Sequence, residues 1–142
     1  MSMIFKVIIA FLAVVITVIL LIYIFPIVKV EGDSMSPTFQ EGRILWCRRL
    51  FFNKNKCKKG SIYVIHLRDE EDGSPYFIVK RLKYIYPYNG KSVLYDFRGD
   101  NTLVSYDSRQ HGYFKSDDVV AKVIGNYKNK YESYQKGEVN EP

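Results

Sequence analysis

The feature that most constrains this chain is an uncharged apolar run near its start. Between Lys6 and Lys29 lie 22 residues, VIIAFLAVVITVILLIYIFPIV, none of which carries a charge. As a helix, this run would be about 33 Å long, which is enough to cross the hydrocarbon core of a bilayer. A buried helix of a globular domain is the plainer alternative for a run that is apolar on every side, and we favour the membrane span over it.

A cleaved secretory signal is the main alternative to a retained anchor. Such a signal has a shorter apolar core, followed by small residues around the cleavage point. Here the run ends in IYIFPIVKVEG, whose large and β-branched residues contain no small-x-small pair. We therefore expect a short cytoplasmic segment over residues 1–6 and a single-pass anchor in the cell membrane over residues 7–28. Lys6 favours a cytoplasmic N-terminus and an extracytoplasmic domain, although Lys29 flanks the other end.

The remaining residues, about 110, are enough for one modest core. Most of their apolar residues are β-branched or aromatic and fall into short runs, most of them separated by turn-forming residues. These runs are RILWCRRLFF (43–52), GSIYVIHLR (60–68), YFIVKRLKYIY (76–86), KSVLYDFRG (91–99) and DVVAKVIG (118–125). We expect a mainly β domain over residues 29–126, a small folded-over sheet or barrel, followed by a polar tail over residues 127–142.

The formal net charge of +6 has one local concentration. The stretch CRRLFFNKNKCKKG (47–60) holds six basic residues and no acid. It lacks a recognised nucleic-acid-binding motif, and the anchor also argues against such a partner. Two interpretations remain open: a solvated hairpin loop, or a loop whose Phe51 and Phe52 enter the lipid interface while the lysines meet anionic head groups.

The cysteines and histidines do not form a metal-binding pattern. Cys47 and Cys57 flank the basic loop, and they could either pair or remain as two thiols. His66 and His111 are isolated, and no cysteine–histidine spacing matches a metal site. The sequence therefore indicates neither a metal nor a cofactor.

A serine directly after the anchor is the first candidate for catalysis. Ser34 lies in VEGDSMSPTFQEG (30–42), a stretch rich in turn-forming residues, so a plain turn is one interpretation. Serine is a weak nucleophile at neutral pH, and catalysis would need a base beside it. His111, in SRQHGYF, stays open as that base. A deprotonated lysine is the other possibility.

One lysine lies inside an apolar strand. In PYFIVKRLKY, Lys80 follows four aromatic or β-branched residues, and strand alternation places it on one face with Ile78 and Leu82. Burial disfavours the ammonium form and would bring its pKa toward neutrality. An exposed lysine on an edge strand is the plainer alternative. Among the lysines of this chain, Lys80 is the best candidate base.

Three stretches together resemble type I signal peptidases, the membrane-anchored enzymes that remove signal peptides from exported proteins. GDSMSPTF (32–39) resembles their serine box, VKR (79–81) is similar to their lysine box, and RGDNTLVSYDSRQHG (98–112) is similar to a third box. The three occur in the family's order after an anchor, and the resemblance extends to about residue 125. It implies a bacterial Ser–Lys serine protease of the plasma membrane. The partners of such a protease would be preproteins and membrane lipid, and the enzyme would use neither a cofactor nor nucleic acid.

The resemblance also implies a role for each matching residue. Ser34 would be the nucleophile and Lys80 the general base, while Ser105 would hydrogen-bond and orient the lysine amine. The backbone N–H of Ser34 would contribute to an oxyanion hole. Gly32 stands where some relatives have a serine that adds a second donor. The substrate would bind as an extended strand with small residues at the first and third positions before the cut.

Two further residues of the third box suggest support for the site. Asp107 and Arg109 are two residues apart, so their side chains could face the same way and pair, bracing the loop that carries Ser105. Relatives usually continue from the lysine box into a Gly-x-Pro-Gly-Asp turn, which this chain lacks. Its Asn89–Gly90 could make a tight hairpin turn instead, so that the strand carrying Lys80 runs longer.

Two other classes of function remain open on sequence alone. One is a catalytically weak or inactive relative that serves as a membrane-held chaperone for surface-fibre subunits. The other is a self-cleaving regulator with a Ser–Lys centre, against which the anchor argues. We favour the protease, because both candidate catalytic side chains are present.

Overall fold

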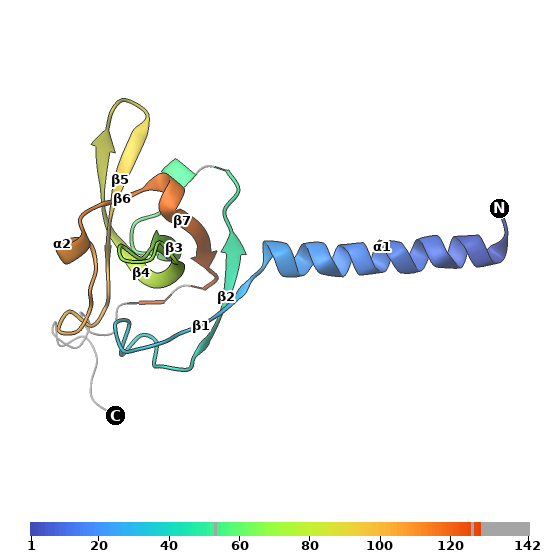
Figure 1. The fold of residues 1–142 in the computed structure, drawn as a ribbon, viewed down its shortest axis with the longest axis horizontal. Helices are drawn as coiled ribbons and strands as arrows, with labels where there is room; N and C mark the ends of the chain where they lie inside the picture. Colours follow the sequence, from blue (N-terminus) through green and yellow to red (C-terminus); the bar gives the residue numbers. More distant parts are fainter. Residues whose placement is uncertain (53, 126, 129–142) are drawn as a thin grey trace.

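The computed structural model describes residues 1–52, 54–125 and 127–128. Helix α1 (Met3–Ile24) extends away from a β domain as a separate rod, and none of its residues is buried (Figure 1). It is long and apolar enough to cross a membrane. The helix begins after Ser2, whose hydroxyl accepts a hydrogen bond from the N–H of Phe5. It ends before Pro26, because proline lacks an N–H and disfavours helical geometry in the preceding residue.

The end of the apolar run is therefore a strand rather than helix. Residues Ile27–Lys29 form β1, which pairs with β2 (Ile44–Arg49). Beyond β1, the N–H of Val30 donates to the carbonyl of Arg43 at 2.8 Å, and the N–H of Gly42 donates back to the carbonyl of Val30 at the same distance. The segment between the helix and Ser34 is thus held in register against its neighbour.

The sheet has seven strands in the order β1-β2-β7-β3-β4-β5-β6, and all neighbouring pairs are antiparallel. The further strands are β3 (Ile62–Arg68), β4 (Pro75–Tyr88), β5 (Ser92–Arg98), β6 (Phe114–Lys115) and β7 (Val119–Val123). The short helices are η1 (Lys54–Lys56), α2 (Ser108–His111) and η2 (Ser116–Asp118). The expectation of a mainly β fold is confirmed, and each of the five predicted runs contains a strand.

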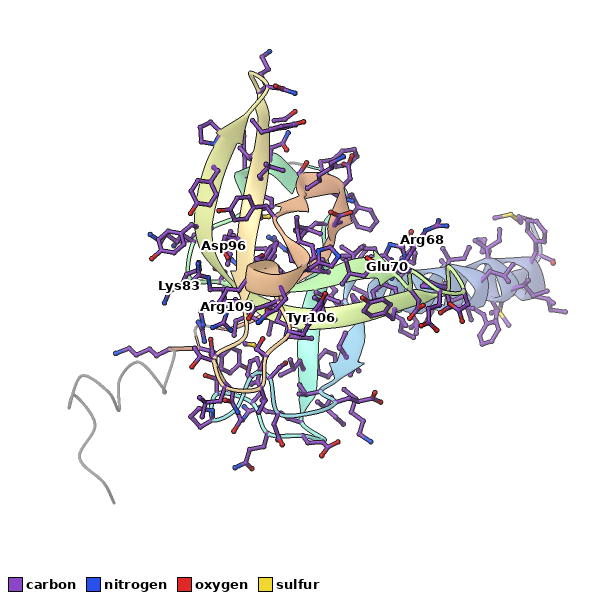
Figure 2. All side chains as sticks on the ribbon, turned by 60° about the vertical axis from the view of Figure 1, so that its left-hand side comes forward. Arg68, Glu70, Lys83, Asp96, Tyr106 and Arg109 are labelled. Atoms are coloured by element: carbon purple, nitrogen blue, oxygen red, sulfur yellow. The ribbon has the colours of Figure 1, made fainter. Side chains whose placement is uncertain are left out.

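The hairpin of β4 and β5 has the turn expected from the sequence. Asn89 and Gly90 both have positive φ, at 44° and 77°, as tight hairpin turns require. Strand β4 accordingly runs for 14 residues. The hairpin of β3 and β4, on which Arg68 and Glu70 are labelled, projects from the body of the domain (Figure 2).

Two hydrophobic clusters make up the core. One lies under β1 and β2 and includes Met35, Phe39 and Cys47. The other contains the rings of Tyr63, Tyr95, Phe97 and Phe114, together with Cys57. The two cysteines therefore belong to different clusters, and both are buried free thiols rather than a disulfide.

Met35 belongs to the first cluster, with 1% of its surface exposed, so it packs in the core. Of the polar tail expected over residues 127–142, the part from residue 129 onward lies outside the described residues.

Candidate active site

Ser34 lies in a turn within residues 30–43, the segment that joins β1 to β2. The N–H of Ser36 donates to the carbonyl oxygen of Asp33 at 3.0 Å. The N–H of Phe39 donates to the carbonyl oxygen of Met35 at 2.9 Å. The side chains of Met35 and Phe39 are buried in the core. Since the residue directly after Ser34 is fixed in this way, the position of the serine is set by packing and not by a free loop.

Gly32 provides the backbone geometry that leads into this turn. Its φ of +72° lies in the left-handed region, which L-amino acids with a side chain rarely adopt. A glycine two residues before Ser34 is therefore a conformational requirement of the turn.

Lys80 lies near the middle of β4 and is 3% exposed. Its cross-strand partner is Tyr63 on β3, and Ile78 and Leu82 flank it on the same face, as the alternation predicts. Burial lowers the pKa of Lys80 from 10.5 to about 8, and the negative charge of Asp107 partly opposes this change. The lysine is therefore poised to lose its proton under mildly alkaline conditions.

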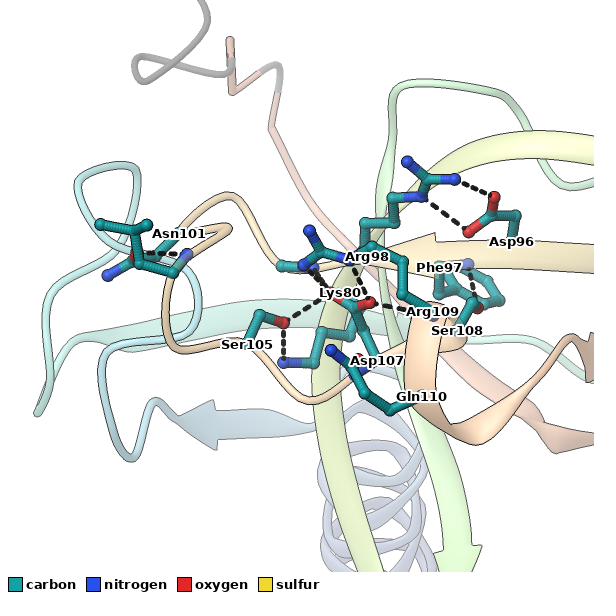
Figure 3. Close-up of polar contacts among 12 residues, drawn as sticks. Lys80, Asp96, Phe97, Arg98, Asn101, Ser105, Asp107, Ser108, Arg109 and Gln110 are labelled. Carbon is teal, nitrogen blue, oxygen red and sulfur yellow. Dashed lines mark hydrogen bonds and ion pairs between the residues drawn. The ribbon is translucent and has the colours of Figure 1, made fainter.

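A chain of hydrogen bonds fixes the amine of Lys80. Its Nζ donates to the hydroxyl of Ser105 at 3.0 Å, and that hydroxyl donates to Oδ2 of Asp107 at 2.7 Å (Figure 3). Arg109 pairs with the same carboxylate through two bonds of 2.8 and 2.9 Å, so the expected pairing of Asp107 with Arg109 is confirmed. Because the hydroxyl proton of Ser105 is directed to Asp107, its oxygen can only accept from the lysine.

Asp107 is the centre of this network. It begins the short helix α2, where its side chain accepts the N–H of Arg109, and the side chain of Gln110 accepts the N–H of Asp107 in return. Burial of Asp107 opposes its ionisation, but hydrogen bonds from Arg109, Ser105 and the N–H of Gly99 hold the pKa of its carboxyl well below its usual range. Asp107 is therefore a fixed negative charge that holds Ser105 in one orientation.

Gly99 is the point at which the serine turn meets the loop carrying Ser105. A Cβ at this position would lie 2.2 Å from Oγ of Ser105 and 2.5 Å from the carbonyl oxygen of Ser34. That carbonyl oxygen also accepts the N–H of Asn101 at 3.0 Å. Glycine is thus needed here for close approach, and it lets two segments far apart in the sequence converge.

A buried ion pair joins the same two segments to β4. Arg81, next to Lys80, makes two bonds of 2.7 and 2.8 Å to the carboxylate of Asp100, which also accepts the hydroxyl of Thr38. The side chain of Arg81 is 7% exposed and that of Asp100 is 2% exposed. Asp100 was not predicted from the sequence as part of the site. The signal available was an arginine in an apolar strand, which requires a buried carboxylate.

Ser34 and Lys80 both line one cleft of about 420 Å³, together with Gly32 and Asp107. Ser105, which accepts a hydrogen bond from Lys80, is buried. The other lining residues are mostly apolar or aromatic: Leu67, Tyr76, Ile78, Val104, Tyr106 and Phe114. The candidate nucleophile and base therefore face the same space, whose walls are mostly apolar but also include Glu31 and Asp33.

His111 also lines this cleft, but its contacts differ from those of Lys80. Its ring stacks on Phe114 with 4.7 Å between centroids and an interplanar angle of 7°. Within residues 1–52, 54–125 and 127–128, no group of three or more His, Cys, Asp or Glu side chains could hold a metal ion. The arrangement suits covalent catalysis by a serine with a neutral amine as its base.

Comparison with known proteins matches this chain to signal peptidases. A family model described as signal peptidase, peptidase S26, matches residues 3–85, a range that includes Ser34 and Lys80. A signal peptidase I from Bacillus caldolyticus is 28% identical over 158 residues, which cover 82% of this chain and 87% of that protein. The signal peptidase complex catalytic subunit SEC11 of Candida tropicalis is 35% identical over 104 residues, which cover 70% of this chain and 58% of that protein.

Proposed function

Because the chain belongs to the signal peptidase family, peptidase S26, we propose that it is a membrane-anchored serine endopeptidase that removes signal peptides from exported preproteins. In this proposal Ser34 is the nucleophile and Lys80 the general base. The observation that carries it is the presence in one cleft of a serine in a rigid turn and a buried lysine whose pKa is lowered to about 8.

The first chemical step is the attack of Ser34 on the scissile peptide bond. The neutral amine of Lys80 takes the hydroxyl proton of Ser34, whose oxygen adds to the carbonyl carbon of the substrate. The N–H of Ser34 donates to the oxygen that becomes negative. Lys80 then gives the proton to the departing amine, which leaves an ester between the signal peptide and Ser34. Water, deprotonated by Lys80, hydrolyses this ester and restores both side chains.

Ser105 and Asp107 act as positioning residues in this scheme. An uncharged amine has two N–H groups and one lone pair, and the hydroxyl of Ser105 accepts one of those N–H groups at 3.0 Å. With that bond fixed, the direction of the lone pair is restricted. Asp107 keeps the hydroxyl of Ser105 an acceptor toward the amine, since Oδ2 of Asp107 accepts the hydroxyl proton, with 2.7 Å between the two oxygens.

The position of the anchor fits a substrate that emerges from a bilayer. Helix α1 ends at Ile24, and the paired strand β1 joins it to the turn of Ser34. We propose that α1 crosses the cell membrane with the N-terminus in the cytoplasm and the catalytic domain outside. Ser34 would then lie near the outer surface, and a signal peptide would enter the cleft as an extended strand.

The test is cleavage of a secretory precursor by the full chain in detergent–lipid micelles. Wild type should cut after a small-x-small site, and Ser34→Ala and Lys80→Ala should each abolish the product. The matched controls are Ser92→Ala and Lys91→Ala, which alter an exposed serine and an exposed lysine and should cleave at the wild-type rate. A wild-type protein that binds precursors without cutting them would overturn the protease in favour of a binding role.

A further inference from the structure

A second hollow lies at the point where α1 meets the β domain, away from the cleft of Ser34. It has a volume of about 520 Å³ and is lined by Ile24 at the end of α1, by the end of β2 and by the loop that follows β2. Figure 1 shows β2 beside the end of the helix. The contacts agree, since Arg49 donates to the carbonyl of Tyr23 at 3.0 Å and the ring of Phe51 lies 5.7 Å from that of Tyr23.

The charges around this hollow are all of one sign. Its lining includes five cationic side chains: Arg48, Arg49, Lys56, Lys58 and Lys122. No described acidic residue lines it, and within the described part of the chain none of the five forms an ion pair with a carboxylate. The hollow is therefore a concave positive surface whose counter-charge must come from outside the domain.

Two of these cations lie directly opposite each other in the sheet, which is an unfavourable arrangement for like charges. Arg48 on β2 and Lys122 on β7 are direct cross-strand partners. Like charges directly opposite each other in an antiparallel pair repel and destabilise the sheet. An anion bound between them would turn this repulsion into attraction.

The neighbouring surface is apolar and faces the same way. On β2, exposed residues alternate with buried ones, so Trp46 shares its face with Arg48 and is 60% exposed. Ile27, its partner on β1, is 56% exposed. At the rim of the hollow, Phe51 and Phe52 are 46% and 83% exposed. Apolar surface beside a basic hollow, at the end of a helix able to span a membrane, matches the chemistry of a lipid interface.

We propose that this hollow binds the phosphate headgroup of an anionic glycerophospholipid. The phosphate is held by Arg48 and Lys122, while the acyl chains descend past Ile24 and Phe51 along α1. The inference rests on the proposed membrane insertion of α1. It adds a lipid site separate from the catalytic cleft, and that site fixes the height and tilt of the domain over the bilayer.

The test uses the only tryptophan of the chain, Trp46, as the reporter. Full-length protein in nonionic micelles is titrated with phosphatidylglycerol carrying brominated chains, and in parallel with brominated phosphatidylcholine. Trp46 fluorescence should be quenched saturably and with higher affinity by phosphatidylglycerol. Arg48→Gln/Lys122→Gln should lower that affinity about tenfold, toward the phosphatidylcholine value. The matched control, Arg68→Gln/Lys115→Gln, removes the same charge elsewhere and should keep the preference.

Each other outcome contradicts a different part of the inference. Equal quenching by the two lipids, or equal losses in the two double variants, overturns the headgroup site. Displacement by millimolar inorganic phosphate assigns the hollow to a free anion and overturns the lipid. If neither lipid quenches Trp46, the membrane placement of this face fails as well. Precursor cleavage by the same samples distinguishes failure of this inference from failure of the proposed function. A protein that cleaves the precursor but shows no lipid preference overturns this inference alone.

Discussion

Replacing Lys80 with methionine should abolish cleavage and at the same time stabilise the fold at neutral pH. Methionine keeps the length of the side chain and removes its charge. A pKa of about 8 in the folded state, against 10.5 for an ordinary lysine, corresponds to about 3 kcal/mol of unfavourable free energy whenever the buried amine is charged. Losing the hydrogen bond to Ser105 costs about 1 kcal/mol, which leaves a net gain of about 2 kcal/mol.

The sign of the pH dependence follows from the same shift. Because the folded pKa of Lys80 lies below its unfolded pKa, the unfolded chain binds more protons between about pH 8 and pH 10.5. The contribution of Lys80 to the stability of the wild type therefore rises with pH through this window, and the penalty for the charged amine is fully present below it. The stability difference between Lys80→Met and wild type should therefore change by about 3 kcal/mol between pH 6 and pH 10.5, from about 2 kcal/mol in favour of the variant to about 1 kcal/mol against it.

The assay is urea unfolding of the full chain in nonionic micelles, followed by the fluorescence of Trp46, at pH 6 and at pH 10.5. Lys91→Met, which alters an exposed turn lysine, serves as the control and should show the same small difference from wild type at both values. Should Lys80→Met be less stable than wild type at pH 6, or differ from it equally at both pH values, the argument that burial sets the pKa of this lysine is refuted.

Three further predictions concern the rate and the architecture of the site. The kcat/KM for a precursor should rise about tenfold from pH 7 to pH 9. A lysine with a pKa of about 8 is about one-tenth neutral at pH 7 and about nine-tenths neutral at pH 9. A flat profile would contradict Lys80 as the base. Gly99→Ala should lower kcat about 100-fold in a chain that still folds, because the new methyl group displaces Ser105 or the backbone of Ser34. A kcat near that of wild type would show that the segments carrying Ser34 and Ser105 need not approach so closely. Arg81→Met should destabilise the domain by about 3–5 kcal/mol in urea unfolding, because it leaves the carboxylate of Asp100 buried and without its ion-pair partner. Adding Asp100→Leu should recover most of the lost stability. No recovery in the double variant would argue against the unpaired carboxylate as the cause.

The sequence predicted those parts of the molecule whose signal is local. Lys80 could be selected from the sequence as a candidate for burial, because a lysine in an apolar strand is either buried or at an edge, and the structure shows it buried. The turn at Asn89–Gly90 was identifiable because a tight hairpin needs positive φ at both positions, and both have it.

What the sequence did not predict depends on contacts between distant segments. Asp100 follows β5, and its partner Arg81 lies 19 residues away on β4. Strand β1 was hidden because Ile27 and Val28 continue the apolar run of the helix, and only the pairing with β2 separates them. Helix α2 has four residues, too few for a helical period, although Asp107 and Gln110 have the spacing of a capping box.

The paired strand β1 has a mechanical consequence for the nucleophile. The segment from Pro26 to Val30 is stiff because β1 is paired with β2. In addition, the N–H and the carbonyl of Val30 are hydrogen-bonded to Arg43 and Gly42, just before β2. If α1 crosses a bilayer and Ser34 is the nucleophile, as proposed above, Ser34 lies at a fixed depth and this paired segment determines where along a substrate the cut falls. Residues inserted between Ile24 and Ile27 would change that depth without touching the cleft. Such a protein should still cleave a short soluble peptide, but it should lose or displace the cut in a membrane-inserted precursor.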